Sequence, residues 1–376
     1  MRYPILIVAL SAVISIVISV TAVTGEQARP ASFCGAPEVA VTLGGREAIG
    51  PLFESGGETW GSRTITFSFA PDENLTVPDV AATPEVRAKE GNSLHRTMNA
   101  RFDREEEWKD IIRGAFAEWE RRTPLRFREV PDDGAPFFAT ESRGQIRFFA
   151  RSFDGAGKRR ADAFPPRYGQ IRFDNAEEWE RDSLLKRVTL HEIGHALGLR
   201  HVCPRSGTKV MEDHLGIPAG LSEDEVRGIH FLYGDALEPN DTSNVNVSRE
   251  KLAETDLSLR VRDGVSGLDR FAVRLPAGST VEITAMPIGS QYDVGPESPQ
   301  CSGQPLDGSR QLPIRIVVEQ IDGEAVREAE LGEPAALSAT VPPDGLLRLR
   351  IEVSGEPKSN TVQRYKLNVR QIGRPT

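Results

Sequence analysis

Three of the six histidines in the chain fall within the eleven residues His-Glu-Ile-Gly-His-Ala-Leu-Gly-Leu-Arg-His, from His191 to His201. His191 and His195 are four residues apart, so on a helix they point to the same side, about one turn apart. Zinc favours such nitrogen ligands in a tetrahedral shell, and it keeps one position open at a catalytic site. Gly198 can adopt the left-handed conformation that ends a helix, so the chain can turn back and bring His201 to the same ion. The motif therefore predicts one catalytic zinc ion bound by three histidines.

Glu192 follows the first of these histidines and is predicted to act on the zinc-bound water, not as a ligand. Zinc lowers the pKa of that water towards ~7, and a carboxylate within reach can take its proton as a general base. The expected reaction is hydrolysis of a peptide bond by a zinc-activated water, after which Glu192 passes the proton to the leaving amine. The alternative, an ordinary amphipathic helix with surface histidines, does not account for this spacing of His, Glu and Gly.

The elements that position this motif can be read from hydrophobic periodicity. Strands are expected at 64–69, 125–130, 146–150 and 171–173. Helices are expected at about 103–122, at 182–198 and after Leu221, where Ser222 and Glu225 form a capping box. A loop rich in Gly and Pro, from Asp154 to Tyr168, is expected between the last two strands. These residues predict an α+β catalytic domain, a twisted sheet with long helices.

Beyond residue 250 every strong signal is that of a β-strand. Apolar and polar residues alternate at 271–275, 281–285, 347–353 and 365–369, with Pro and Gly turns between them. Short strands of this kind predict an all-β sandwich. The expected order is a signal peptide at 1–24, a short propeptide or leader at 25–57, the catalytic domain at 58–236, a linker at 237–250 and the sandwich at 251–376.

The bulk composition and the N-terminus limit the class of protein. The chain has 376 residues, 39% of them hydrophobic, and a net charge of −9, which argues against nucleic acid as a partner because phosphate binding needs a basic surface. An apolar run from Ile5 to Val23 follows Arg2 and precedes small residues, as in a secretory signal peptide. The protein is therefore expected to be secreted, or membrane-anchored if this run is not cleaved. The sequence does not determine the oligomeric state, and a monomer is the expectation.

At this point the sequence resembles the metzincins, and among them the matrixins. The long zinc signature matches at every defining position, and Met211 resembles the methionine of the turn beneath the metal. Ala115 to Phe127 resembles the first matrixin helix and the strand after it, and Leu221 to Gly234 resembles the last helix, so the resemblance covers roughly 58–235. It implies a zinc metalloendopeptidase that acts on extracellular proteins or peptides.

Two departures from the matrixin pattern concern metals. Asp162 and Arg172 stand where histidines of a second, structural zinc are expected, so one zinc ion per chain is predicted. Asp154, Asp174 and Glu177 match the family's calcium-ligand positions, and oxygen ligands suit calcium. Calcium is therefore a second candidate cofactor, and solvated carboxylates are the alternative.

The resemblance also raises the questions of latency and specificity. Cys34-Gly35-Ala36-Pro37 resembles the matrixin cysteine switch, in which a propeptide thiolate occupies the open zinc position. The alternatives are a disulfide from Cys34 to Cys203 or Cys301, and a free thiol in the leader. Arg187 lies one turn before His191, where matrixins form the floor of the pocket for the residue after the scissile bond. A shortened pocket is the prediction, and a solvent-facing Arg187 is the alternative.

The C-terminal half resembles the bacterial pre-peptidase C-terminal domain. The matching residues are Glu238 to Thr242, Asp269 to Gly278 and Tyr365 to Val369. Two other classes remain open for the whole chain: an inactive protease fold that serves as a binding protein, and a surface-anchored structural protein. Because Glu192 is intact, the peptidase is the preferred interpretation.

Overall fold

The computed structural model of the chain describes residues 58–72, 75–78, 89–179, 183–202, 206–213, 218, 220–263, 265–294, 304–320, 323–355 and 360–374. The predicted signal peptide and leader lie outside these residues, as do Cys34, Cys203 and Cys301.

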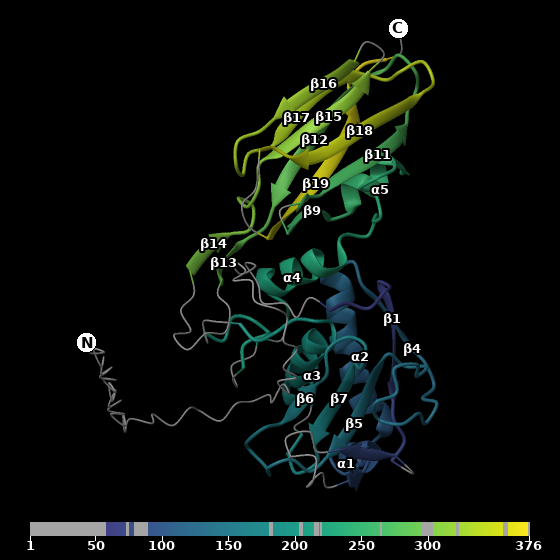
Figure 1. The fold of residues 1–376 in the computed structure, drawn as a ribbon, viewed down its shortest axis with the longest axis vertical. Helices are drawn as coiled ribbons and strands as arrows, with labels where there is room; N and C mark the ends of the chain where they lie inside the picture. Colours follow the sequence, from purple (N-terminus) through teal and green to yellow (C-terminus); the bar gives the residue numbers. More distant parts are fainter. Residues whose placement is uncertain are drawn as a thin grey trace, which may run out of the picture. The chain divides into compact units, whose positions relative to one another are not determined.

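The N-terminal half is built on a five-stranded sheet in the order β4-β1-β5-β7-β6 (Figure 1). β1 pairs in parallel with β4 and β5, β5 pairs in parallel with β7, and only β6 runs antiparallel to its neighbour. The strands are β1 (Thr64–Phe69), β4 (Arg126–Glu129), β5 (Ile146–Arg151), β6 (Ala161–Ala163) and β7 (Gln170–Asp174). The four predicted strands are confirmed. β6 lies inside the segment expected to be a loop, because three residues are too few to show a periodicity.

Two long helices, α2 (Glu105–Arg122) and α3 (Ser183–Ala196), lie against this sheet (Figure 1). Both predicted helices are confirmed. α2 has three acidic residues in its first turn and two arginines in its last turn, which suits the helix dipole, and it ends before Pro124. Its aromatic face is fully inside the core: Trp108 and Trp119 are buried, and Phe116 stacks on Phe67 with ring centroids 4.1 Å apart.

Smaller elements that the periodicity does not predict precede α2. They are the hairpin strands β2 (Thr76–Pro78) and β3 (Lys89–Gly91) and the helix α1 (Leu94–Asn99). β2 and β3 have three residues each, too few to show an alternation, and α1 has six, which is less than two helical turns.

The last helix of this half, α4 (Glu223–Tyr233), begins with the predicted capping box. The Ser222 side chain accepts from the N–H of Asp224, and Glu225 accepts from the N–H of Ser222 at 2.7 Å. Gly234 ends the helix with a φ of 74°, a conformation that favours glycine.

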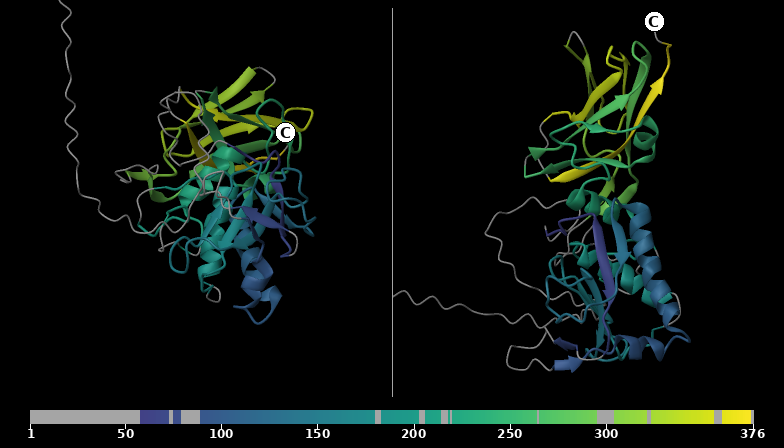
Figure 2. Two further views of the ribbon diagram at one scale, coloured as in Figure 1. Left: turned by 60° about the horizontal axis from the view of Figure 1, so that its bottom comes forward. Right: turned by 90° about the vertical axis from the view of Figure 1, so that its right-hand side faces the viewer.

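The C-terminal half is a sandwich of two five-stranded sheets, in the orders β10-β9-β19-β12-β17 and β16-β15-β18-β11-β8. The two layers can be followed from green to yellow in Figure 2, and buried aliphatic side chains fill the space between them. The strands are β8 (Val245–Asn246), β9 (Leu257–Arg262), β10 (Val265–Ser266), β11 (Leu268–Arg274), β12 (Thr280–Ile288), β15 (Ile314–Gln320), β16 (Gly323–Glu328), β17 (Ala335–Thr340), β18 (Leu346–Val353) and β19 (Thr361–Gln371), with a separate hairpin of β13 (Gln291–Val294) and β14 (Gln304–Asp307).

The sandwich confirms the all-β prediction for this half. One difference lies at its start, where β8 falls inside the expected linker and the short helix α5 (Arg249–Glu254) begins there. Ser248 caps α5 by accepting from the N–H of Lys251. The domain boundaries themselves remain predictions. Among the residues that the structure describes, no helix is long and apolar enough to cross a membrane.

Candidate metal centre

α3 carries the first two histidines of the motif, and the turn after it carries the third. α3 ends at Ala196, and Gly198 follows with a φ of 101°. A Cβ at Gly198 would lie 2.4 Å from the carbonyl oxygen of Glu58, so both the conformation and the close backbone approach require glycine here. The chain therefore turns back over the helix, as the sequence predicts.

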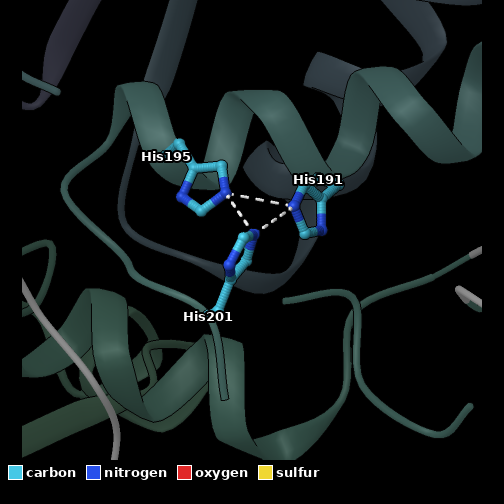
Figure 3. A group of neighbouring side chains, drawn as sticks. All are labelled: His191, His195 and His201. Atoms are coloured by element: carbon cyan, nitrogen blue, oxygen red, sulfur yellow. Dashed lines mark hydrogen bonds between the residues drawn. The ribbon is translucent and has the colours of Figure 1, made fainter. Parts of the chain in front are cut away.

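The three imidazoles converge on one point (Figure 3). The Nε2 atoms of His191 and His195 are 3.0 Å apart, those of His195 and His201 are 3.1 Å apart, and those of His191 and His201 are 3.2 Å apart. Nitrogens bound to one tetrahedral zinc at 2.0–2.1 Å lie about 3.3 Å from one another. The spacing in the structure therefore fits a single zinc-sized ion.

The hydrogen bonds of the Nδ1 atoms show which ring nitrogen carries the proton and which has a free lone pair. His191 Nδ1 lies 2.7 Å from the carbonyl oxygen of Val210, and His195 Nδ1 lies 2.9 Å from that of Leu199. A carbonyl can only accept, so both Nδ1 atoms carry the proton, and the Nε2 lone pairs face inward. Outer-shell contacts of this kind orient metal-binding histidines. The donor set therefore suits a cation.

Glu192 lies on α3 between the two helical histidines in sequence, and its side chain is fully buried. Its carboxylate therefore does not lie on a solvent-exposed surface of the helix.

Met211 lies beneath α3, at the place that the resemblance predicts. Its side chain is buried, and a Cβ added to Gly194 would meet the Met211 sulfur at 2.2 Å. The backbone N–H of Met211 donates to Glu225 Oε1 at 3.1 Å. The turn is thus held between the metal-site helix and the start of α4.

Asp162 and Arg172 face each other on the paired strands β6 and β7 and form a buried ion pair. Arg172 Nε lies 2.7 Å from Asp162 Oδ1, and Arg172 Nη2 lies 2.5 Å from Oδ2, a two-pronged contact. Arg172 also donates to the carbonyl oxygen of Pro78. At the two positions where the resemblance predicts histidines of a structural zinc, an ion pair joins the two strands.

The carboxylates proposed for calcium do not form a ligand group within the described part of the chain. Asp174 Oδ1 accepts from the N–H groups of Phe153 and Ala176, and Glu177 accepts from Gly157 and Arg160. Among the described residues, the carboxylate oxygens of Asp154, Asp174 and Glu177 do not all lie within 4.8 Å of one another. Calcium at this loop therefore remains a prediction.

A second group of carboxylates was missed by the sequence analysis. Asp235, Glu238 and Asp269 each place an oxygen within 4.8 Å of the others. Burial raises the pKa of Asp235 to about 7 and also raises the pKa of Asp269. Arg260 pairs with Glu238 at 2.9 Å, and the Tyr365 hydroxyl donates to Asp269. The run from Glu238 to Asp241 is the local signal, but Asp269 comes close only through the fold.

Comparison with known proteins agrees with this geometry. The matrixin family model matches residues 92–234. Hatching enzyme from Paracentrotus lividus is 37% identical over 131 residues, which cover 34% of this chain and 22% of that protein. Interstitial collagenase from Bos taurus is 31% identical over 214 residues, covering 53% of this chain and 45% of that protein.

A third relative and one solved structure extend the comparison. Matrix metalloproteinase-19 from Mus musculus is 31% identical over 185 residues, covering 46% of this chain and 29% of that protein. The crystal structure of myroilysin aligns with 50% of this chain and 63% of that chain at 15% identity, with a TM-score of 0.24, which is too low to support an argument. The chain spans less than half the length of the three curated relatives.

The matched range contains α2, the three converging histidines, Met211 and α4. The family model and the metal-site geometry thus identify the same segment of the chain. The segment from residue 92 to residue 234 is thus similar to the matrixins.

Proposed function

We propose that the protein is a zinc-dependent endopeptidase that hydrolyses internal peptide bonds of extracellular proteins or peptides. The observation that carries the proposal is the convergence of three inward-facing imidazole Nε2 atoms at 3.0–3.2 Å. We assign His191, His195 and His201 as the zinc ligands and Glu192 as the catalytic residue that is not a ligand. The matrixin relatives support the same class of reaction.

A zinc ion held by these nitrogens supplies a Lewis acid that acidifies a water molecule and polarises the peptide carbonyl. Glu192 would act as the general base toward the attacking water and would then donate the proton to the nitrogen of the leaving amine. The carbonyls of Val210 and Leu199 hold the His191 and His195 rings in the tautomer that keeps Nε2 free for the metal. Burial of Glu192 keeps its carboxylate away from bulk water.

We also propose a preference for the substrate residue that follows the scissile bond. Arg187 lies one turn before His191 on α3, is partly buried, and its Nε makes no hydrogen bond within the described part of the chain. A solvent-facing arginine paired with a carboxylate would not bury this atom. The burial of this atom argues against a fully solvent-facing Arg187. We therefore keep the interpretation in which Arg187 shortens the pocket and small or medium apolar residues are preferred.

The proposal is tested by Glu192→Ala in the zinc-loaded protein, with zinc content and cleavage of a quenched peptide library as the two measurements. Zinc content should stay at the parent value, and the cleavage rate should fall ~10²–10⁴-fold, the usual contribution of a general base. His201→Ala should lose both zinc and activity. Asp110→Ala, an exposed carboxylate on α2, is the matched control and should change neither.

Cleavage by Glu192→Ala at the parent rate would show that the proposed mechanism is wrong. A parent protein that binds zinc at these histidines and cleaves no peptide in the library would favour the alternative, a protease fold that acts only as a binding or surface protein.

A further inference from the structure

The turn that carries Met211 is coupled directly to the histidine cluster. The carbonyl oxygen of Val210 accepts the hydrogen bond from His191 Nδ1. The next carbonyl, that of Met211, accepts from the N–H of Val202, the residue after His201, at 3.1 Å. A displacement of this turn would therefore reorient His191 and move His201.

The start of the same turn contacts a hairpin of the C-terminal half. Buried Glu212 accepts hydrogen bonds from the backbone N–H groups of residues 207–209 at 2.6–3.2 Å and so shapes the turn. Lys209, only 1% exposed, extends its side chain from the turn and donates from Nζ to the carbonyl oxygen of Asp293 on β13 at 3.0 Å. A buried ammonium needs such an acceptor, because leaving it unpaired away from water is costly.

Helix α4 makes the larger contact with that half. Every residue of α4 is buried, including Glu223, Arg227 and His230, which lie on one face at a spacing of four and three residues. On a helix at a protein surface, such a polar face would point into water. We call these three residues the docking face, since the C-terminal sandwich and its hairpin cover them.

The docking face is matched by specific partners on the other half. Arg364 of β19 places Nη1 2.9 Å from both carboxylate oxygens of Glu223, and the two side chains are only 7% and 5% exposed. Arg227 donates to the carbonyl oxygen of Gly308 at 3.2 Å and to Thr361 Oγ1 at 3.3 Å. Breaking a buried ion pair by removing one partner leaves the other charge buried and uncompensated. These contacts therefore tie the sandwich to α4 much more firmly than an exposed ion pair would.

α4 passes this attachment to the metal site through its first turn. Glu225, two residues after Glu223, accepts from the N–H of Met211 with one carboxylate oxygen and from Ser222 with the other. The turn beneath the histidines thus contacts α4 through Glu225 and the C-terminal half through Lys209. α4 itself contacts the C-terminal half through its docking face.

We propose that the C-terminal sandwich is a permanent part of the peptidase that positions the turn beneath the metal, through the docking face of α4 and through the contact between Lys209 and Asp293. Arg364 and Lys209 are positioning residues, which act on His191 through Val210 and Met211. The proposal rests on the proposed function, because it takes the three histidines to be the metal site. It implies that the sandwich is retained in the active protein.

The test uses the full chain loaded with zinc and, in parallel, with cobalt(II), whose visible absorption reports the geometry of the ligand shell. Arg364→Met is compared with Arg370→Met, a matched control on the same strand β19 whose partner Glu282 is exposed. Zinc release to a chelator should become about 10-fold faster in Arg364→Met, the lower end of the ~10–100-fold effect of losing outer-shell support. The cobalt spectrum should change, and kcat should fall with little change in KM. Arg370→Met should match the parent in all three.

Lys209→Met, which keeps most of the side-chain length, provides a second variant if Arg364→Met does not fold. It should show the same faster release and altered spectrum. Parent-like zinc release and cobalt spectra in both folded variants would overturn the proposal, even if the parent is an active peptidase. A parent that binds no zinc would instead contradict the proposed function, so the two failures are distinguishable.

Discussion

Gly194→Ala is the substitution whose effect the structure defines most closely. Gly194 lies on α3, one residue before His195, where an added Cβ would meet the Met211 sulfur at 2.2 Å, its methyl carbon at 3.1 Å and Trp119 Cζ2 at 3.4 Å. Met211 is 1% exposed and its turn is hydrogen-bonded on both sides, so the sulfur cannot simply move into water. The substitution therefore forces the turn and α3 apart.

The size of the effect follows from two opposing contributions. Overpacking a core costs ~1–3 kcal/mol, and replacing glycine by alanine inside a helix returns up to ~1 kcal/mol. We expect the free energy of unfolding to fall by about 1–2 kcal/mol in Gly194→Ala, and zinc to be released faster because His195 moves with its helix.

The assay is denaturant unfolding of the zinc-loaded and chelated protein, together with zinc release. Gly114→Ala is the matched control: Gly114 lies inside α2, and a Cβ there would meet nothing within 4 Å. This control should be more stable than the parent by up to ~1 kcal/mol. If Gly194→Ala were as stable as Gly114→Ala and released zinc at the parent rate, the close contact between α3 and Met211 would be refuted.

Three further predictions concern metal content, specificity and pH. Elemental analysis should find one tightly bound zinc per chain, and Arg172→Met should lower the free energy of unfolding by ~3–5 kcal/mol because it leaves Asp162 buried without its main partner; two tight zinc ions, or a loss below 1 kcal/mol, would contradict this. Arg187→Leu should admit larger residues after the scissile bond in a cleavage profile, and an unchanged profile would favour a solvent-facing Arg187. Burial, together with the nearby Arg364, lowers the pKa of His230 to about 3. Between pH ~6.5 and 3 the His230 side chain therefore binds a proton only in the unfolded chain. The free energy of unfolding is unaffected by His230 above pH ~6.5 and falls towards pH 3 by up to ~1.4 kcal/mol per pH unit. In His230→Leu, the free energy of unfolding should therefore depend less steeply on pH between pH ~6.5 and 3 than in the parent. A pH dependence as steep as that of the parent would contradict the assignment.

Much of the site could be predicted from the sequence because its determinants are local. The spacing of His191, His195 and His201 around Gly198 depends on helix geometry and on one left-handed turn. The capping box of Ser222 and Glu225 is likewise a property of four consecutive residues. Such patterns need no knowledge of distant parts of the chain, so the predicted helices and main strands of the first half agree with the structure.

Contacts between residues far apart in the sequence could be decided only by the tertiary structure. Asp162 and Arg172 were recognised as departures from a zinc site, but their two-pronged ion pair requires β6 to lie beside β7. The polar face of α4 is covered because Arg364, 141 residues from Glu223 in the sequence, pairs with it in the fold. Periodicity shows which residues of a helix share a face. Which residues cover that face depends on contacts between distant parts of the chain. Bringing such parts together costs loop-closure entropy, which only the interactions of the complete fold offset.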